Sequence, residues 1–327
     1  MGFSGDCLCI KNDYTFDRIE NLKVGDILFN PNKKVGSKII DIKEKYSTEG
    51  YVIKTNNFFE FNIDENTLLK TSNLNIEEAG IFFNEPIFKK PNDLNLVTFL
   101  LMHKLNIKEN EDFENLYLYS KLIKKGKKNK NYIIFANFYE KAKKYTNNIQ
   151  HLNSFEIGKN ENIKNIYLTL KKEPSWINVL NKKPNQRFLE KDLFFISSTN
   201  FEYFLKEYLK ENAYQYLDLN NFRIYSQSKT IITQMLYLFT NHLELVPNVE
   251  QIKKELWTYE NVKQSSKKNI FTISIHNEFK KPILKNNNYY QEIKKIEKNN
   301  RNIKYYEIIT ENNEEFIVYN VITKGVG

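Results

Sequence analysis

The side chains best suited to covalent chemistry are few and scattered in this chain. Its 327 residues include two cysteines, Cys7 and Cys9, and four histidines. One residue separates the cysteines, so on a strand they would point to opposite faces. Two cysteines can form neither a multi-disulfide scaffold nor a zinc site with four cysteine ligands. Cys7 could serve as a nucleophile, but we expect a buried structural cysteine at this position.

The two ends of the chain carry motifs that belong together. The start runs Phe3-Ser4-Gly5-Asp6-Cys7-Leu8-Cys9 and then Leu22-Lys23-Val24-Gly25-Asp26. The end runs from Tyr306-Glu307-Ile308-Ile309 through a polar turn to Phe316-Ile317-Val318-Tyr319-Asn320-Val321-Ile322. Together these stretches resemble the two halves of the self-splicing intein (Hint) family, over about residues 2–90 and 285–325. The resemblance implies one horseshoe-like all-β domain formed by both chain ends.

The resemblance also assigns the first catalytic stations of protein splicing. An intein opens with a Cys or Ser nucleophile, and an internal Thr-x-x-His pair polarises the peptide bond that this nucleophile attacks. Here Gly2 takes the place of the nucleophile. Asp64 takes the place of the internal Thr, and Thr67 that of the internal His. None of the four histidines lies in this segment.

The residues expected at the last catalytic positions of splicing are replaced as well. An intein ends with a His and an Asn, whose amide cyclises, and a Cys, Ser or Thr follows as the acceptor. Lys324 takes the place of the His, Gly325 that of the Asn and Val326 that of the acceptor. Glycine cannot cyclise and valine cannot accept an acyl group, so we predict a Hint domain that does not splice.

The pattern of apolar residues changes twice along the chain. Short alternating strands are predicted up to about residue 90, including 51–54 and 58–63. Helices are then predicted over Asp93–Leu105, Asn200–Glu211 and Thr230–Leu243, with Ser226-Gln227-Ser228-Lys229 capping the last of them. A strand is predicted over 222–225, before this cap. Strands return after about residue 268, including 271–275, 304–309 and 316–322. This order predicts an α+β fold with three segments, 1–90, 91–265 and 266–327, in which a mixed α/β domain interrupts the Hint domain.

The middle segment resembles a LAGLIDADG homing endonuclease. Phe204–Ala213, followed by Arg223–Lys229 and a helix, is typical of the second repeat of this family, and Leu96–Asn106 would be the first. The family binds divalent metal with an acidic residue at the end of each of two packed helices. Asn212 stands where the second acid belongs, and its neighbour Glu211 would point about 100° away around the helix. We therefore predict no metal site, and Mg²⁺ would be needed only if nuclease activity survives.

Binding to duplex DNA could persist without the acids, because it requires cations that face phosphates. Lys and Arg exceed Asp and Glu by 49 to 40, a net charge of +9. An AT-rich gene explains such lysine abundance equally well, and a solvated lysine-rich loop is as common as a DNA contact. The candidate contacts are Lys121, Lys124, Lys125, Lys127, Lys128, Lys130, Arg223 and Lys229.

Three functions from different classes remain open at this stage. The first is a degenerate intein-like protein that has lost splicing and keeps some DNA affinity. The second is a structural or interaction protein, for example of a viral particle, that reuses the scaffold. The third is a free-standing homing endonuclease that cuts through displaced acids.

The expected location is inside a cell or virus. No stretch approaches the ~20 apolar residues of a membrane helix. The start of the chain lacks a basic region followed by an apolar run, which a secretion signal would have. We therefore expect an intracellular protein, cytoplasmic, nuclear or virus-associated, without membrane contact. The oligomeric state is not indicated.

Overall fold

The computed structural model describes most of the chain. The residues outside the description are 1, 57, 78–79, 106, 108, 110–112, 125, 129–132, 138–148, 159–163, 220, 253–256, 260–261, 265–269, 276–282 and 326–327. Internal contacts divide the chain into two compact units. The first unit contains Met1–Asn106, Glu244–Glu250 and Lys280–Gly327, and the second contains Ile107–Leu243 and Gln251–Phe279. Both ends of the chain thus belong to the same unit.

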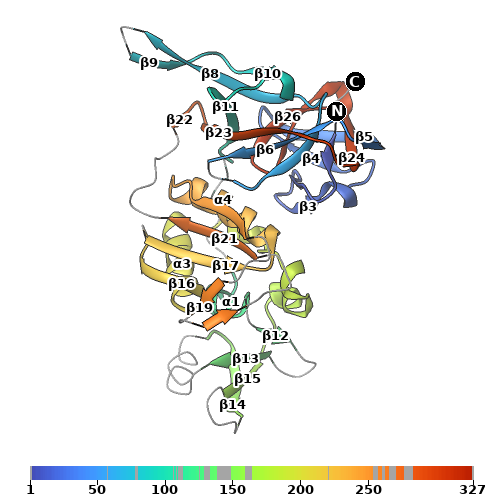
Figure 1. The fold of residues 1–327 in the computed structure, drawn as a ribbon. Coiled ribbons are helices and arrows are strands. Elements are labelled where there is room, and N and C mark those ends of the chain that lie inside the picture. The colour runs from blue at the N-terminus through green and yellow to red at the C-terminus, as the bar shows by residue number, and fades with distance from the viewer. Residues whose placement is uncertain are drawn as a thin grey trace. The chain divides into compact units, whose positions relative to one another are not determined.

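The first unit is built from antiparallel strands (Figure 1). Their bounds are β1 Phe3–Ser4, β2 Leu8–Ile10, β3 Phe16–Arg18, β4 Ile27–Asn30, β5 Lys33–Ser47, β6 Gly50–Thr55, β7 Phe61–Asp64, β8 Leu69–Glu77, β9 Gly80–Phe83, β10 Ile87–Lys89, β11 Thr98–His103, β22 Ile283–Lys285, β23 Asn288–Asn299, β24 Ile303–Thr310, β25 Glu315–Val318 and β26 Val321–Lys324. The hydrogen-bonded order is β3-β2-β25-β26-β8-β11-β23-β6-β7-β1-β24-β5-β4, with β9 and β10 on β8 and β22 on β23. Three short 3-10 turns, Ile19–Asn21, Pro91–Asp93 and Glu311–Asn313, connect described strands.

The two ends of the chain interleave in this sheet. Phe3 of β1 lies opposite both Tyr306 of β24 and Ile63 of β7. Strand β2 pairs with β25, and β26 pairs with β8. The predicted α+β class is therefore confirmed, and the chain ends build one large antiparallel sheet together.

An aromatic cluster joins the early and late strands of the first unit. The ring centroids of Phe58 and Tyr319 lie 5.2 Å apart, and those of Phe61 and Tyr319 lie 6.1 Å apart. Tyr319 sits in the two-residue turn between β25 and β26 with φ at 54°, a conformation that is strained for an aromatic residue. Its hydroxyl donates to the Asp6 carbonyl at 3.0 Å, which holds the turn against the start of the chain. The predicted continuous strand 316–322 is wrong for this reason: the chain reverses at Tyr319.

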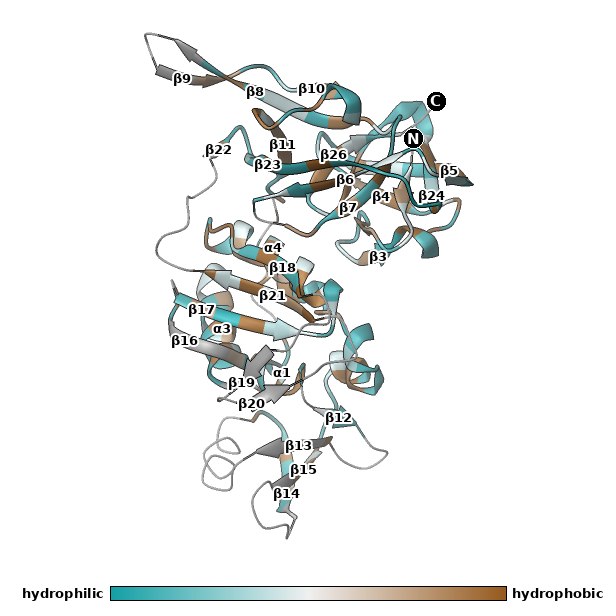
Figure 2. Cartoon of the chain, in the orientation of Figure 1, coloured by the Kyte–Doolittle hydropathy of each residue, from teal (hydrophilic) through white to brown (hydrophobic). Residues whose placement is uncertain are grey.

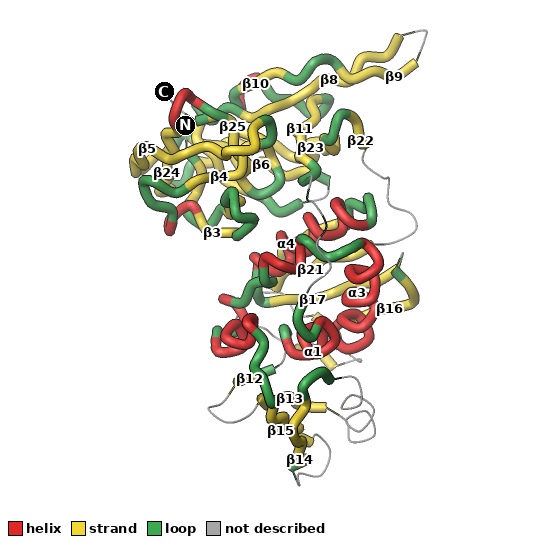
Figure 3. Tube along the Cα trace, turned by 180° about the vertical axis from the view of Figure 1, so that it is seen from behind, coloured by secondary structure: helices red, strands yellow, loops and turns green. Residues whose placement is uncertain are grey.

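The second unit contains the described α-helices, as Figure 3 shows. They are α1 Leu116–Leu122, α3 Ser198–Asn212 and α4 Lys229–His242. The strands are β12 Lys127–Lys128, β13 Ile133–Asn137, β14 Leu152–Ile157, β15 Lys164–Leu170, β16 Ala213–Asp218, β17 Asn221–Ser226, β19 Trp257–Tyr259, β20 Val262–Gln264 and β21 Ile270–Ile275, while β18, Asn248–Ile252, spans the boundary between the units. The sheets are β12-β13-β15-β14, β19-β20 and one in which β17 lies between β16 and β21. The 3-10 segments are Ser175–Asn181, Pro184–Gln186 and Lys191–Phe194.

Local sequence explains the two long helices. The Ser197 hydroxyl accepts from Asn200 N, and the Ser228 hydroxyl accepts from Ile231 N, so each helix begins with a side-chain cap. Along β17 buried and half-buried residues alternate, with Phe222 and Ile224 buried. Figure 2 shows both hydrophilic and hydrophobic residues along this strand. The predicted helices 200–211 and 230–243 and the strand at 222–225 are thus confirmed. Strand β21, which we assigned to the C-terminal segment, belongs to the second unit.

The helix predicted over Asp93–Leu105, and with it the first endonuclease-like repeat at Leu96–Asn106, is wrong. Pro91–Asp93 forms a 3-10 turn, and Thr98–His103 forms strand β11 between β8 and β23. Most residues of this strand are buried, on both of its faces. A strand covered on both faces carries the same continuous apolar run as a buried helix, so periodicity cannot separate them. The helix that packs against α3 is α1 instead.

Among the described residues, no helix has the length and apolar character needed to cross a membrane.

Candidate functional site

Thr67 forms hydrogen bonds with Gly2, at the start of the chain, and with Asp64, the last residue of β7. Its Oγ1 lies 3.0 Å from Gly2 N, 2.9 Å from Gly2 O and 2.9 Å from Asp64 Oδ1. A hydroxyl carries one hydrogen, so it accepts from the Gly2 amide and donates to one of the two oxygens at a time. Gly2, Asp64 and Thr67 were assigned to catalytic positions of splicing from motifs alone. The Thr67 hydroxyl is thus within hydrogen-bond distance of the other two residues.

Asp64 is a buried carboxylate that holds this arrangement. Its side chain is fully buried, and its Oδ2 lies 2.5 Å from the ammonium of Lys45, on the neighbouring part of the sheet. Burial by itself raises the pKa of Asp64, but the hydrogen bond and charge of Lys45, together with the Thr67 hydroxyl, outweigh burial and lower the pKa. An ionised carboxylate therefore orients the Thr67 hydroxyl. A threonine hydroxyl is too weak an acid to protonate a leaving group at neutral pH, so Thr67 cannot act as a histidine would at this position.

Gly2, the position predicted for a nucleophile, has no room for a side chain. A Cβ built on Gly2 would lie 2.9 Å from Tyr305 Cβ and 3.3 Å from the Tyr306 carbonyl oxygen. Tyr305 is fully buried in β24, so it cannot move aside without shifting the strand. A cysteine or serine at position 2 would therefore disturb the pairing of β1 with β24.

Near the other end of the chain, Gly325 also has no room for a side chain. Gly325 N donates to the Glu314 carbonyl at 3.0 Å, and a Cβ on Gly325 would lie 2.1 Å from Thr310 Oγ1 and 3.1 Å from Thr310 Cβ. The Lys324 ammonium lies 6.0 Å from the centre of the Phe88 ring, where it makes a cation–π contact. Val326, the predicted acceptor position, lies outside the described residues.

One short segment of the chain holds both ends. Thr67 binds Gly2, and the next residue, Leu68, accepts a 2.6 Å hydrogen bond at its carbonyl from the Thr323 hydroxyl. Thr323 also lies opposite Leu69 in the β26–β8 ladder. The first and last described strands are therefore anchored within three residues of each other. No local pattern in the sequence indicated the roles of Lys45, Tyr305 and Thr310.

A scan against protein-family models finds no match for this chain, and a search of curated proteins finds none either.

A second arrangement of charged side chains lies where α1 and α3 pack in the second unit. Lys121 Nζ lies 2.7 Å from Glu207 Oε2 and 3.0 Å from the Glu207 carbonyl oxygen, and Lys210 Nζ lies 2.6 Å from Glu207 Oε1. The Lys121 side chain is 3% exposed. Burial raises the pKa of Glu207, but the hydrogen bonds and charges of the two lysines outweigh burial and lower the pKa. The ion pair of Lys121 and Glu207 thus lies in the contact between α1 and α3.

The ends of the same two helices meet at Asn212. Lys124 Nζ donates to the Asn212 carbonyl at 2.8 Å, and Asn212 Nδ2 donates to the Tyr208 carbonyl at 2.9 Å. The predicted acid position therefore carries an amide beside a cation, which repels divalent metal. Glu211 lies in the last turn of α3, but its side chain is outside the description. Among the described residues, no group of three or more His, Cys, Asp or Glu side chains is placed to hold a metal ion.

The candidate DNA contacts fall into three groups. Internal partners engage Lys121 through Glu207, Lys124 through Asn212, and Lys128 through Glu173. Lys127 is exposed, whereas Arg223 and Lys229 are half-buried. Lys125 and Lys130 lie outside the described residues. Lys121 is too deeply buried to reach a phosphate, and Lys127 is the exposed member of the described set.

Replacing Gly2 with alanine tests the closed start of the chain. We expect Gly2→Ala to lower the free energy of unfolding by about 1–3 kcal/mol, because the added methyl group overlaps Tyr305. Urea denaturation followed by circular dichroism measures the change. Lys43→Ala, on an exposed part of β5, is the control and should stay within about 0.5 kcal/mol of the parent. Equal behaviour of the two variants would show that the space beside Gly2 is open.

Acid titration tests the role of Asp64. Since folding lowers its pKa, Asp64 stabilises the folded state above its unfolded pKa of about 3.9, and this contribution disappears as the pH falls through the lower folded pKa. Asp64→Asn should cost about 1–3 kcal/mol at pH 7, and the difference from the parent should shrink below about pH 4. Chemical denaturation at pH 7, 5, 4 and 3 measures it, with the exposed Asp41→Asn as control. A difference that stays constant from pH 7 to 3 contradicts the assignment.

A double-mutant cycle tests the pair at the helix contact. Lys121→Met alone leaves Glu207 short of a partner and should cost about 1–3 kcal/mol. The double variant with Glu207→Leu should recover most of that loss, because two apolar residues can replace a buried pair. The exposed pair Glu202 and Lys206 is the matched control, with an expected coupling below about 0.5 kcal/mol. Equal coupling energies for the two pairs would contradict a buried, structural role for Lys121.

Proposed function

We propose that this chain is a splicing-inactive relative of inteins that acts by binding duplex DNA through its second unit. The observation that carries the intein assignment is the contact between Thr67 and Gly2. Motif spacing alone assigned Thr67 to the internal histidine station and Gly2 to the nucleophile station. In an intein the internal pair acts on the peptide bond of the opening residue, and here the Thr67 hydroxyl bonds to both backbone groups of Gly2.

The chemistry of splicing is absent from this arrangement. Gly2 has no side chain, Thr67 is no general acid at neutral pH, and Lys324 and Gly325 supply neither an imidazole nor an amide that could cyclise. The spaces that side chains at positions 2 and 325 would need are filled by Tyr305 and Thr310. These features support a scaffold that is retained for binding and not for bond cleavage.

The second unit is the part of the chain that we assign to DNA. Arg223 and Tyr225 alternate with Phe222 and Ile224 along β17, so they share the face turned away from the buried residues. Together with the exposed Lys127 and the net charge of +9, this face supplies cationic and hydrogen-bonding groups suited to a duplex. The same unit argues against cleavage, because Lys124 and Asn212 stand at the predicted acid position.

A second candidate, a structural or interaction protein, is favoured by the hairpin of β8 and β9. Phe82 on this hairpin is 43% exposed, and Ile87, on the neighbouring strand β10, is 52% exposed. Strand β9 pairs with β8 and lies off the main path of the sheet, so its outer edge is a place where another chain can add a strand. Internal partners also engage several lysines that DNA binding would use.

Electrophoretic mobility shift with a duplex of about 30 base pairs tests the DNA assignment. We expect retardation at about 50 mM salt and a linear fall of log K with log salt concentration. Lys127→Gln should reduce that slope by about 0.9, because one phosphate contact is lost. The control Lys43→Gln, in the first unit, should leave the slope unchanged.

The possible outcomes separate the two candidates. No retardation at about 50 mM salt removes the DNA assignment. Recovery of the chain at a fixed ratio in a larger assembly would then support the interaction protein. A slope equal in parent and Lys127→Gln would remove Lys127 from the DNA-binding surface.

A further inference from the structure

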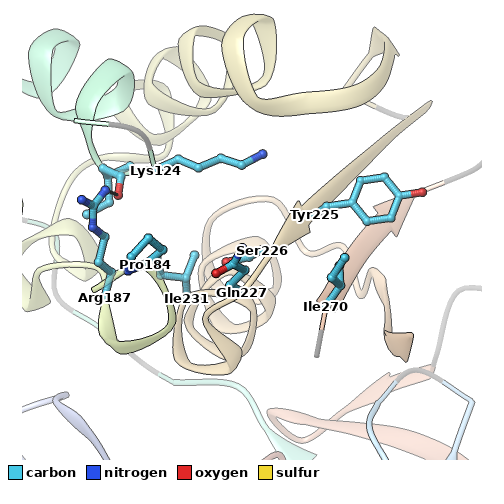
Figure 4. Close-up of a pocket in the computed structure, with 9 residues that line it drawn as sticks. Lys124, Pro184, Arg187, Tyr225, Ser226, Gln227, Ile231 and Ile270 are labelled. Carbon is cyan, nitrogen blue, oxygen red and sulfur yellow. Dashed lines mark hydrogen bonds between the residues drawn. The ribbon is translucent and has the colours of Figure 1, made fainter. Parts of the chain in front are cut away.

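A cavity of about 300 Å³ lies within the second unit, where α1 ends and α4 begins. Figure 4 shows Arg187 and Pro184 on one side, Tyr225 and Ile270 on the other, and Gln227 and Ile231 between them. Ile123 and Lys124, just after α1, and Ser226 complete the wall. A volume of this size is at the lower end of the range for small-molecule sites.

Arg187 gives this wall a positive charge that no acid balances. The residue is 3% exposed. Its guanidinium donates to the carbonyl oxygens of Ile123 at 2.9 Å, Gly126 at 2.6 Å, and Leu180 and Lys182 at 3.3 Å. These acceptors are neutral, and in the part of the chain that the structure describes no carboxylate forms an ion pair with Arg187. An arginine keeps its proton in such surroundings, so the charge persists.

Other groups on the wall favour the same kind of ligand. Lys124 adds a second cation to the wall, and its ammonium donates to the Asn212 carbonyl at 2.8 Å. Ser226 and Gln227 lie just before the N-terminus of the 14-residue helix α4, where the helix dipole favours negative charge. The remaining wall, which includes Ile123, Pro184, Ile231 and Ile270, is apolar.

We infer that this cavity binds a small organic anion, with its carboxylate, phosphate or sulfonate group at the cationic side formed by Lys124 and Arg187 and its apolar body against Ile231 and Ile270. A buried cation without a counter-charge is unfavourable in the empty protein, and an anionic ligand removes that cost. The inference does not depend on DNA binding, because its cationic groups, Arg187 and Lys124, are not part of the β17 face that we assign to the duplex, although Tyr225 belongs to both that face and the cavity wall.

Fluorescence titration with 8-anilinonaphthalene-1-sulfonate tests the site with the whole chain. This probe carries an anionic group on an aromatic body and brightens in apolar surroundings. We expect saturable binding of one probe per chain and about tenfold weaker binding of the uncharged analogue N-phenyl-1-naphthylamine, which lacks the charge-assisted hydrogen bond. Lys124→Gln should weaken the sulfonate probe about tenfold as well. Lys206→Gln, an exposed lysine on α3, is the matched control and should change binding less than about twofold.

A second variant keeps the test decisive if Lys124→Gln fails to fold. Gln227→Glu places a negative charge in the wall and should also weaken the sulfonate probe, by about tenfold. Competition with deoxyadenosine monophosphate and with octanoate then identifies the body of the natural ligand, since displacement by one of them assigns a nucleotide or an aliphatic acid. Equal affinity for the charged and uncharged probes, insensitivity to both variants, or displacement by neither competitor would overturn the inference.

Discussion

The first unit depends on the position of strand β24, which hydrogen-bonds to β1 on one side and to β5 on the other. This placement brings the start of the chain into the middle of a sheet that the end of the chain completes. Tyr305 and Thr310 of the same strand also occupy the spaces beside Gly2 and Gly325. The pairing of β24 and the lack of room for a side chain at these two glycines therefore have one structural cause.

In the second unit, charged and polar side chains at the ends and contact of two helices have internal partners. At the helix contact, Glu207 is paired with Lys121 and Lys210. At the helix ends, Lys124 bonds to the backbone of Asn212 where an acid would be expected. In both units, residues at the predicted catalytic positions have internal hydrogen-bond partners: Thr67 bonds to Gly2, and Asn212 Nδ2 donates to the Tyr208 carbonyl, whereas Asn212 Oδ1 is buried without a partner among the described residues.

Sequence reasoning reached the features that local patterns encode. The helices α3 and α4 begin at serine caps, and β17 alternates between buried and half-buried residues, so their positions could be read in advance. The intein resemblance assigned Gly2 and Thr67 to two positions of one reaction, and the structure places them within hydrogen-bond distance of each other. Strand β11 was mistaken for a helix, because a strand buried on both faces has no alternation. Lys45 and Arg187 could not be assigned, since their partners lie far away in sequence and leave no periodic signal.

The interleaved ends have a consequence for folding during translation. One side of β1 and one side of β2 stay unpaired until β24 and β25 emerge from the ribosome. About 200 residues separate the end of β11 from the start of β24, and at about 5–20 residues per second their synthesis takes about 10–40 s. The nascent chain carries open strand edges throughout that interval, and such edges template aggregation. The yield of folded protein therefore depends on keeping the open edges of different nascent chains from pairing with each other until β24 and β25 have been synthesised.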